Sequence, residues 1–418
     1  MKTILFLFTL LPAVWGLSQD HTVSAFSNET HTGGGTYNQT YDFPADNSMY
    51  DEIIMNIALT CPPGGCDPWD RFASIKAIKD GEKFEIARYI TPYGNNWCNW
   101  TLDVTEYREI LKGTVELESF IDTWSNGWDL TVSFDYYLGT PDYEYVDVAN
   151  IWVDYNFVYG DSIFFSIDLP EKTFTIPSNA EKSVVRIVNT GHGQGNTDNA
   201  AEFSQKTHNV EVDGSVAFNQ FLWNSTCSSN PCSPQGGTWQ YARAGWCPGA
   251  QVDPTDYDIT SLVTAGNTAT FDYELEPYFN DCSPWNPSCI NGTTCAECTY
   301  NNNGHTQPHY KISAQLITYS STPIQIANQE ELAFEGRIEL YPNPAGQGTS
   351  RLFIQAENAQ DINIEIVTAV GQVVSTSTIA SLNGSTYYEL PTQNFTSGSY
   401  LVRVTIDGNS FTKKLIIQ

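Results

Sequence analysis

Residues 72–90 read Phe-Ala-Ser-Ile-Lys-Ala-Ile-Lys-Asp-Gly-Glu-Lys-Phe-Glu-Ile-Ala-Arg-Tyr-Ile and contain two short β-branched and aromatic runs, 72–78 and 84–90. Similar runs recur along the chain, separated by Gly, Pro, Asn and Asp, at 52–59, 131–137, 164–169 and 184–188. Helical periodicity is nearly absent, and the one modest candidate, 104–111, could equally be a turn. The pattern predicts an all-β protein made of β-sandwiches or jelly rolls.

The segment Gly139-Thr140-Pro141-Asp142 marks the predicted boundary between two sandwiches, at 20–141 and 142–322. Three long stretches are poor in strand pattern: 190–202, 224–249 and 279–309. The second and third contain seven of the ten cysteines, so we expect them to be ordered. Ordered long loops on a rigid β scaffold are where a binding site is expected.

The composition limits the classes of partner. Lys and Arg total 19 against 48 Asp and Glu, which gives a net charge of −29. A surface this acidic repels phosphate groups, so we expect no nucleic-acid partner and no polybasic binding to membranes. Charged residues make up 16% and aromatic residues 13%, a balance that fits neither intrinsic disorder nor a coiled coil.

The first 19 residues have the pattern of an export signal, with Lys2 before an apolar run from Ile4 to Trp15. A buried core strand is the alternative, but the position directly after Lys2 favours a signal. The run is too short to cross a bilayer, which takes about 20 apolar residues. We therefore expect the rest of the chain to be exported and soluble.

The ten cysteines, an even number in an exported chain, favour disulfides over free thiols. The spacing Cys295-Ala-Glu-Cys298 is also that of a zinc knuckle, but no second such pair exists to complete a zinc site. We therefore expect a disulfide-stapled loop and no metal or other cofactor. The residues leave open the pairing of Cys98, Cys232, Cys282, Cys289, Cys295 and Cys298.

The end of the chain has a pattern of its own. Residues 323–336 are polar and acidic, which predicts a linker before a strand-rich unit at 337–418. Four elements follow in that unit: Leu340-Tyr341-Pro342-Asn343-Pro344, Gly371-Gln372-Val373-Val374, Gly398-Ser399-Tyr400-Leu401-Val402-Arg403-Val404 and Lys413-Lys414-Leu415-Ile416-Ile417-Gln418. They predict a small antiparallel, immunoglobulin-like β-sandwich.

In order and pattern, these four elements resemble the type A C-terminal sorting domain of the Bacteroidetes type IX secretion system. The resemblance implies a protein of a Gram-negative bacterium that passes through the periplasm and is secreted or held at the cell surface. The type IX secretion machinery would then be a partner of the tail. An ordinary terminal immunoglobulin-like module is the alternative.

Four clusters of residues could carry chemistry. In the first, Asp70 and Arg71 follow a tight loop between Cys61 and Cys66, with Trp69 beside them. A carboxylate beside a guanidinium and an indole could bind sugar hydroxyls or act as a base. Taken alone, however, Asp-Arg at the start of a strand is more often a structural ion pair.

The second cluster contains Asp122 and Trp124. Strand alternation from Val115 places Asp122 on the same face as Glu116 and Glu118. The simpler interpretation of this row of carboxylates is a solvated sheet face.

The third and fourth clusters lie in the long loops. Glu202 follows the Gly-rich segment 190–196, whose glycines would allow close approach to a ligand and whose His192 could be an acid or base. Arg243 and Trp246 lie beside a cysteine and would make a rigid donor and stacking pair. Polar surface is the simpler interpretation of His192 and of Arg243.

Other motifs argue against common enzyme classes. The chain has no G-x-S-x-G, H-E-x-x-H or P-loop pattern. His305 and His309 are four residues apart, but Pro308 prevents a helix there, which leaves only a weak metal-binding alternative.

Taken together, the four clusters resemble the peptide-N-glycosidase F family of amidases, which release N-glycans from asparagine. The resemblance runs from about residue 42 to 324 and is most specific in four segments. These are Cys66-Asp67-Pro68-Trp69-Asp70-Arg71-Phe72-Ala73, Arg88-Tyr89-Ile90-Thr91-Pro92-Tyr93, Gly139-Thr140-Pro141-Asp142-Tyr143 and Arg243-Ala244-Gly245-Trp246-Cys247-Pro248-Gly249. It implies two adjacent eight-stranded jelly rolls with the active site between them.

The resemblance also implies site residues. The principal catalytic aspartate of the family falls on Asp70, and its second-domain glutamate falls on Glu202. Its active-site arginine and tryptophan fall on Arg243 and Trp246, and Arg71 and His192 match neighbouring positions. The implied disulfides are Cys61–Cys66 and Cys227–Cys247.

Some positions depart from the family. Its other important glutamate aligns with Asp122, whose side chain is one methylene shorter. Ala200 and Ser204 replace a cysteine pair that flanks the glutamate, and a tryptophan that lines the site becomes Thr190.

The resemblance predicts a secreted amidase, expected to be monomeric, that acts on N-glycosylated peptides and glycoproteins and converts Asn to Asp. Asp70, oriented by Arg71, would activate water, while Asp122, Glu202 and Arg243 would position substrate and Trp124 or Trp246 would stack on sugar. The main alternative is a glycan-binding protein that has lost turnover. A copper monooxygenase is another alternative, but six scattered His and three Met fit it poorly; a structural adhesin is a third.

Overall fold

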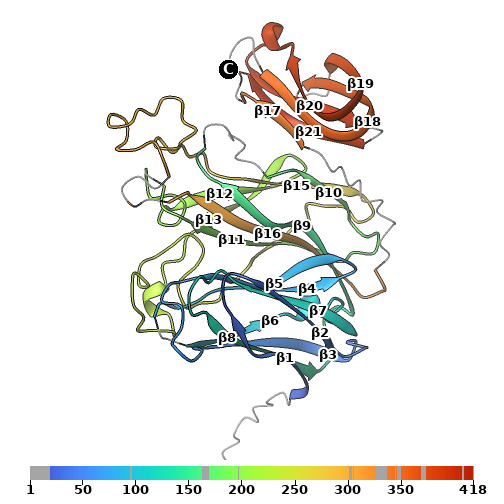
Figure 1. Cartoon of the computed structure of the whole chain (residues 1–418). Helices are drawn as coiled ribbons and strands as arrows, with labels where there is room; N and C mark the ends of the chain where they lie inside the picture. Colours follow the sequence, from blue (N-terminus) through green and yellow to red (C-terminus); the bar gives the residue numbers. More distant parts are fainter. Residues whose placement is uncertain are drawn as a thin grey trace, which may run out of the picture.

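The computed structural model describes residues 19–94, 97–161, 169–195, 197–300, 304, 306–324, 337–343, 345, 350–368, 373–406 and 409–417. Almost all of these residues lie in strands and loops (Figure 1). The predicted signal, apart from Gln19, and most of the predicted linker at 323–336 fall outside the described residues. The predicted strand 164–169 does so as well, apart from Leu169.

The first pair of sheets lies between Gln19 and Leu138 and encloses one core. One sheet has the order β1-β8-β3-β6 and the other β2-β7-β4-β5, all antiparallel. Their bounds are β1 (Gln19–His31), β2 (Thr36–Asp42), β3 (Tyr50–Thr60), β4 (Phe72–Lys79), β5 (Glu82–Ile90), β6 (Cys98–Asp103), β7 (Thr114–Ile121) and β8 (Trp128–Leu138).

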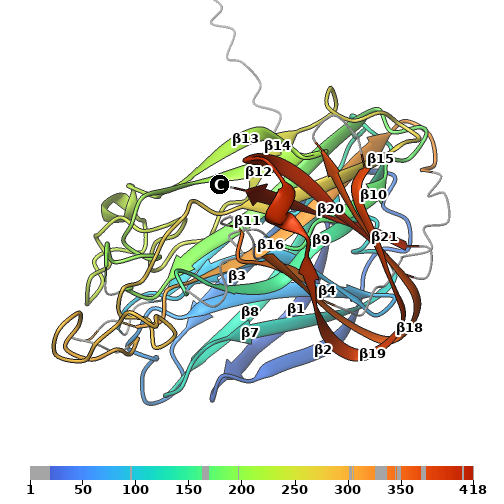
Figure 2. The same ribbon diagram turned by 90° about the horizontal axis from the view of Figure 1, so that it is seen from above.

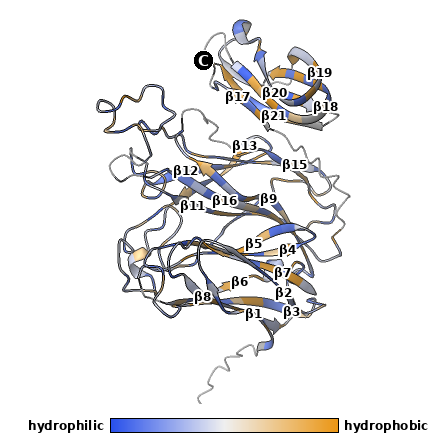
Figure 3. Cartoon of the chain, viewed as in Figure 1, coloured by the Kyte–Doolittle hydropathy of each residue, from blue (hydrophilic) through white to orange (hydrophobic). Residues whose placement is uncertain are grey.

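Alternation along these strands explains the packing. In β3, for example, Ile53, Met55, Ile57 and Leu59 are fully buried, while the residues between them are only partly covered. Figure 3 shows hydrophobic and hydrophilic residues interspersed along the strands in this way. The strands predicted at 52–59, 72–78, 84–90 and 131–137 are confirmed.

The second pair of sheets repeats the architecture around its own core. The sheet orders are β10-β15-β12-β13 and β14-β11-β16-β9. The bounds are β9 (Tyr145–Val158), β10 (Lys172–Thr175), β11 (Lys182–His192), β12 (Lys206–Val212), β13 (Ser215–Leu222), β14 (Thr255–Asp258), β15 (Thr268–Glu274) and β16 (His309–Ser320). Each of the two sandwiches therefore has eight strands among the described residues, which confirms the predicted fold class.

The boundary predicted at 139–142 lies between β8, which ends at Leu138, and β9, which begins at Tyr145. The two sandwiches lie side by side (Figures 1 and 2). The domain limits themselves stay a prediction.

Buried polar residues join the two sandwiches. Arg88 on β5 is fully buried and forms an ion pair with Glu85, at 2.6 Å between Nε and Oε1. Across the interface, Arg88 Nη1 donates to Thr190 Oγ1 at 3.1 Å and to the carbonyl of Lys311 at 2.6 Å. Because a buried pair is costly to break, this network fixes how the loops of the two sandwiches face each other.

Glu118 on β7 belongs to this interface and not to a solvated face. Glu118 is buried, and its oxygens accept from Lys76 at 3.0 Å and from Lys83 at 2.5 Å. Lys76 in turn pairs with Asp154 of β9 at 2.5 Å. The expectation of a solvated row of carboxylates is therefore wrong for Glu118.

The C-terminal unit is an all-β domain with a separate core. Its strands are β17 (Arg337–Tyr341), β18 (Ser350–Thr368), β19 (Val373–Leu390), β20 (Gly398–Ile406) and β21 (Asn409–Ile417). They form one antiparallel sheet, and the long strands β18 and β19 bend so that the sheet folds over its core (Figure 2, red).

The short helices are 3₁₀ turns: η1 (Thr105–Tyr107), η2 (Cys227–Ser229) and η4 (Thr392–Asn394). The segment 104–111, left open between helix and turn, contains η1. Within the described residues, no helix is long and apolar enough to cross a membrane.

Candidate active site

The candidate site forms where loops of the two sandwiches meet. Asp70 lies at the end of the β3–β4 loop, and Tyr93 follows β5. Glu202 lies in the turn between β11 and β12, and Arg243 lies in the long loop between β13 and β14. The fold therefore brings together four residues that are far apart in the sequence.

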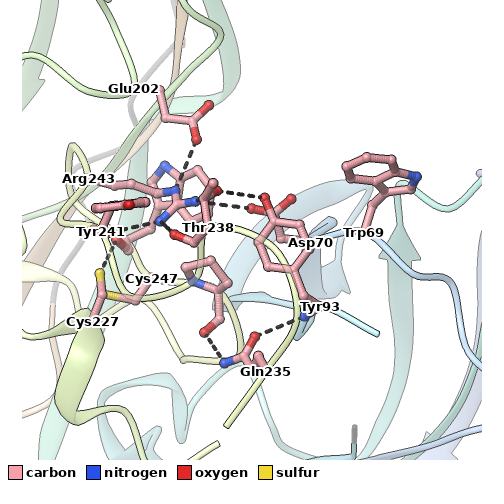
Figure 4. Close-up of polar contacts among 12 residues, drawn as sticks. Trp69, Asp70, Tyr93, Glu202, Cys227, Gln235, Thr238, Tyr241, Arg243 and Cys247 are labelled. Atoms are coloured by element: carbon pink, nitrogen blue, oxygen red, sulfur yellow. Dashed lines mark hydrogen bonds and ion pairs between the residues drawn. A yellow bond between two sulfur atoms is a disulfide. The ribbon is translucent and has the colours of Figure 1, made fainter. Parts of the chain in front are cut away.

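Arg243 is at the centre of the site and is fully buried. Its Nε donates to Glu202 Oε1 at 3.0 Å, and its Nη2 lies 3.8 Å from Asp70 Oδ2. The remaining donors are held by the loop: Nη1 binds the carbonyls of Thr238 and Tyr241, and Nη2 binds Thr238 Oγ1 at 2.9 Å. Figure 4 shows the carboxyl groups of Asp70 and Glu202 both directed toward this guanidinium.

Aromatic rings fix the plane of the guanidinium. Arg243 lies 4.8 Å from the ring centroid of Trp246 and 5.0 Å from that of Phe203. Trp246 is itself only 3% exposed and donates from Nε1 to the carbonyl of Gly191 at 2.7 Å. The expectation that Trp246 stacks on sugar is therefore wrong, because both its ring and its N–H are occupied inside the protein.

Burial dominates the electrostatics of the two carboxyl groups. It raises the pKa of Asp70 to about 6, against the opposing attraction of Arg243. Burial also raises the pKa of Glu202 to about 7. The charge of Arg243 opposes this rise, and the negative charge of Asp70 adds to it. Two carboxyls with raised and different pKa values can serve near neutral pH as a base and an acid.

The loop before β4 holds Asp70 through its neighbours. Asp67 is fully buried and accepts from Arg71 Nε at 2.8 Å, Thr123 Oγ1 at 2.7 Å and the Trp69 amide at 3.0 Å. Although burial opposes them, these hydrogen bonds hold the pKa of Asp67 below its ordinary value.

Arg71 therefore forms its ion pair with Asp67 and not with Asp70, which corrects the expectation that Arg71 orients the aspartate. The disulfide Cys61–Cys66 closes the same loop, as the resemblance implied.

Tyr93 is a site residue that sequence reasoning did not single out. Its hydroxyl hydrogen-bonds Asp70 and lies 3.3 Å from Thr238 Oγ1. Its amide donates to Gln235 Oε1 at 2.9 Å, so the β13–β14 loop holds it across the domain boundary. The sequence did contain information that pointed to Tyr93, because this residue ends one of the four segments in which the family resemblance is most specific.

Asp122 lies directly after β7 and has a partner of its own. Its Oδ1 accepts from Trp124 Nε1 at 3.0 Å, and its amide donates to the carbonyl of Phe72 at 2.9 Å. Burial lowers the pKa values of His309 and Lys311, and the nearby charge of Asp122 opposes that shift. The structure thus brings Asp70, Glu202 and Arg243 together and gives Asp122 other contacts.

Exposed aromatic rings lie beside the site. Trp69, adjacent to Asp70, is 58% exposed, and Trp124 is 72% exposed. Trp69 projects away from the ion-paired cluster in Figure 4. These two rings, unlike Trp246, are available to a sugar.

His192 is packed between rings. It stacks on Trp246 at 5.2 Å and on His309 at 5.5 Å between centroids, and its Nε2 lies 2.9 Å from Thr190 Oγ1. Burial, with the neighbouring His309, holds the pKa of His192 well below its ordinary value. His192 is therefore neutral near pH 7 and packs against the ring of Trp246.

The Gly-rich segment packs against the protein itself. Gly193 has φ +76°, and a Cβ there would lie 2.0 Å from the carbonyl oxygen of Gln307. The expectation that these glycines leave room for a ligand is wrong at Gly193, where the neighbouring chain takes the space.

All ten cysteines form disulfides. Cys227–Cys247 is the second pair that the resemblance implied. The pairs that the sequence left open are Cys98–Cys232, Cys282–Cys295 and Cys289–Cys298. Cys295 and Cys298 thus have different partners, which contradicts the zinc-knuckle alternative.

Within the described part of the chain, no cluster of three or more His, Cys, Asp or Glu has a metal-binding arrangement. His305 lies outside the described residues.

Comparisons with known proteins agree with this geometry. Residues 161–317 match the family model "Peptide-N-glycosidase F, C terminal", and residues 339–418 match "Secretion system C-terminal sorting domain". The chain is 33% identical over 305 residues to peptide-N(4)-(N-acetyl-beta-D-glucosaminyl)asparagine amidase F of Elizabethkingia miricola, covering 68% of this chain and 78% of the relative.

Solved structures of similar proteins share the two-sandwich core. A recombinant peptide:N-glycanase F is 29% identical with a TM-score of 0.62, covering 73% of this chain and 97% of its own. PNGase F of Flavobacterium meningosepticum is 28% identical with a TM-score of 0.61, covering 73% and 98%. PNGF-II, 15% identical with a TM-score of 0.55 and coverages of 73% and 66%, shares the fold.

The sorting domain, together with the five disulfides, indicates a secreted or cell-surface protein that carries a type IX sorting tail. The identity and coverage with amidase F, and the matching core, show that this chain belongs to the peptide-N-glycosidase F family.

Proposed function

We propose that the protein is an amidase that hydrolyses the bond between an asparagine side chain and the first N-acetylglucosamine of an N-glycan. The observation that carries the proposal is the pair Asp70 and Glu202, both ion-paired with the buried Arg243. Their pKa values, about 6 and about 7, suit a base and an acid at neutral pH.

The proposed reaction begins with water bound at Asp70. As the water oxygen attacks the carbonyl carbon of the asparagine side chain, Asp70 accepts its proton. The tetrahedral intermediate then collapses, the carbon–nitrogen bond breaks, and protonated Glu202 gives its proton to the leaving glycosylamine. The products are an aspartyl peptide and a glycosylamine, which loses ammonia in water.

Arg243 has two tasks in this scheme. Its charge keeps Asp70 ionised at neutral pH despite burial, because it opposes the rise in the pKa of that carboxyl. It also fixes both carboxyls relative to one another, since its donors are held by Thr238, Tyr241 and Glu202. Preorganisation of this kind lowers the barrier without movement during the reaction.

Substrate binding is assigned to residues that remain accessible. The exposed rings of Trp69 and Trp124 would stack on the first sugars, and Asp122, held by Trp124, would accept hydrogen bonds from hydroxyl or acetamido groups. No step requires a metal or other cofactor. N-glycosylated peptides and glycoproteins are the proposed substrates.

We further propose that the protein is a monomer, that it crosses the periplasm of a Gram-negative bacterium and that the type IX machinery recognises its tail. The sorting-domain match supports the last two statements.

Replacing Asp70 by Asn tests the reaction. Loss of the base should lower the rate of deglycosylation of a denatured glycoprotein by about 10²–10⁴-fold while the fold is retained. The matched control is Asp80→Asn, the same change at an exposed aspartate in the β4–β5 turn, which should leave the rate unchanged.

Full activity of Asp70→Asn would refute the assignment of the base. The shorter carboxylate at Asp122 favours a second candidate, a glycan-binding protein without turnover. Binding of a glycopeptide by the unmodified protein, with no release of glycan, would establish that alternative.

A further inference from the structure

An insertion between β15 and β16 projects from the second sandwich (Figure 1, golden loop at the upper left). Its described residues include 278–300 and 306–308, and two disulfides, Cys282–Cys295 and Cys289–Cys298, staple it. Both ends of this insertion contact the turn at 193–202 that leads from β11 to Glu202.

The first end contacts the turn through Tyr278 and Phe279. The Tyr278 hydroxyl donates to the carbonyl of Thr197 at 2.6 Å and lies 3.1 Å from Thr197 Oγ1. Thr197 Oγ1 also donates to the carbonyl of Phe279 at 3.2 Å. The Tyr278 ring is held independently, because it stacks on Tyr159 at 4.8 Å between centroids.

The second end pairs with Gln194. The Gln194 amide donates to Thr306 Oγ1 at 3.1 Å, and the Thr306 amide donates to the carbonyl of Gln194 at 3.1 Å. Next to this pair, Gly193 is packed against the carbonyl of Gln307. Hydrogen bonds from both ends of the insertion therefore hold the turn.

Glu202 is bonded to the same part of the turn that the insertion contacts. Its amide donates to the carbonyl of Gly193 at 3.0 Å, and its own carbonyl accepts from Ala244 at 2.9 Å. Within the turn, Asp198 and Asn199 have φ of 60° and 52°. Asp and Asn adopt this left-handed conformation more readily than other non-glycine residues, so the turn accommodates it at little cost.

We propose that the stapled insertion is a positioning element for Glu202, acting through the hydrogen bonds that Tyr278 and Thr306 make to the turn. The inference rests on the proposed catalytic role of Glu202. Tyr278 and Thr306 touch no reacting group; they hold the backbone from which the carboxyl of Glu202 projects toward Arg243.

Tyr278→Phe tests the proposal, because it removes only the hydroxyl and keeps the ring on Tyr159. We expect kcat on a glycopeptide to fall about threefold to tenfold, as for loss of one or two hydrogen bonds, with KM within about twofold. Thr306→Val should act in the same way. A loosened turn admits water and lowers the pKa of Glu202, so the alkaline limb of the pH profile should move to lower pH.

The matched control is Thr294→Val. Thr294 belongs to the same insertion, but its hydroxyl donates to the carbonyl of Ser288 at 3.3 Å, within the disulfide-stapled part, so kcat should stay unchanged. An unchanged kcat in both Tyr278→Phe and Thr306→Val overturns the proposal, as does an equal loss in Thr294→Val. If Glu202→Gln itself retains full activity, the proposed role of Glu202 fails instead, and the two failures are distinguished.

Discussion

The buried Asp70 makes a quantitative prediction about stability. Its pKa of about 6 in the folded protein exceeds the ordinary 3.8, so the folded state binds this proton more tightly than the unfolded state does. Below about pH 3.8 the carboxyl is protonated in both states and costs nothing. Between about pH 3.8 and 6 the unfolded chain releases this proton while the folded protein still holds it, so the folded state loses stability over that window and none above it.

The size of the effect follows from 1.36 kcal/mol per pH unit. Between 3.8 and about 6 the full penalty is about 3 kcal/mol, of which about 1 kcal/mol is already present at about pH 4.5. Asp70→Asn removes the charge at every pH. Relative to the unmodified protein, the variant should therefore gain about 2 kcal/mol in unfolding free energy between about pH 4.5 and 8.

Guanidinium denaturation of both proteins at the two pH values measures this difference. The control is Asp67→Asn, three residues earlier in the same loop, where the folded-state pKa is lowered. Asp67 contributes stability that is complete above its unfolded pKa of 3.8 and is lost only as the pH falls below it, so the difference in unfolding free energy between Asp67→Asn and the unmodified protein should stay nearly constant between the same pH values. If the unfolding free energies of Asp70→Asn and the unmodified protein change with pH in the same way, the conclusion that burial raises the pKa of Asp70 is refuted.

Three other predictions follow from the site and the fold. The pH profile of kcat/KM should be bell-shaped with its maximum between about 6 and 7, because Asp70 must be ionised and Glu202 protonated; a flat profile from about pH 5 to 9 would contradict this pairing. Trp69→Ala should raise KM for a glycopeptide about fivefold, equivalent to about 1 kcal/mol of lost stacking, and an unchanged KM would remove Trp69 from the binding site. A protein ending at residue 324 should keep kcat/KM within about twofold, since the C-terminal domain has its own core, and loss of activity would show that the tail supports the site.

Much of the fold could be predicted because it depends on local patterns. Alternation in 52–59 and the apolar runs at 72–78 and 84–90 identify strands without reference to the rest of the chain. The number of strands in each sandwich came only from the family resemblance, and the strand order was not predicted, because sheet pairing joins residues far apart, as β1 and β8 do.

The site was less predictable from the residues alone. Arg71 follows Asp70 directly, yet its side chain pairs with Asp67, because the direction of a side chain at a strand start depends on the preceding loop. Trp246 is a large aromatic in a loop, and its burial depends on packing against Arg243, three residues earlier, and against His192, which comes from a distant segment.

The pairing of cysteines that are far apart in the sequence could not be predicted either. Cys98 and Cys232 are 134 residues apart, and only the packing of the two sandwiches brings them together. Sequence spacing carries no information about such a pair.

The most direct test of the central claim is incubation of the purified protein with a high-mannose glycopeptide in water labelled with heavy oxygen. Mass spectrometry should show release of the intact glycan and conversion of Asn to Asp, with one heavy oxygen in the new carboxyl. A peptide that keeps its glycan, or one that retains Asn carrying a single N-acetylglucosamine, would contradict the assignment of the protein as an amidase.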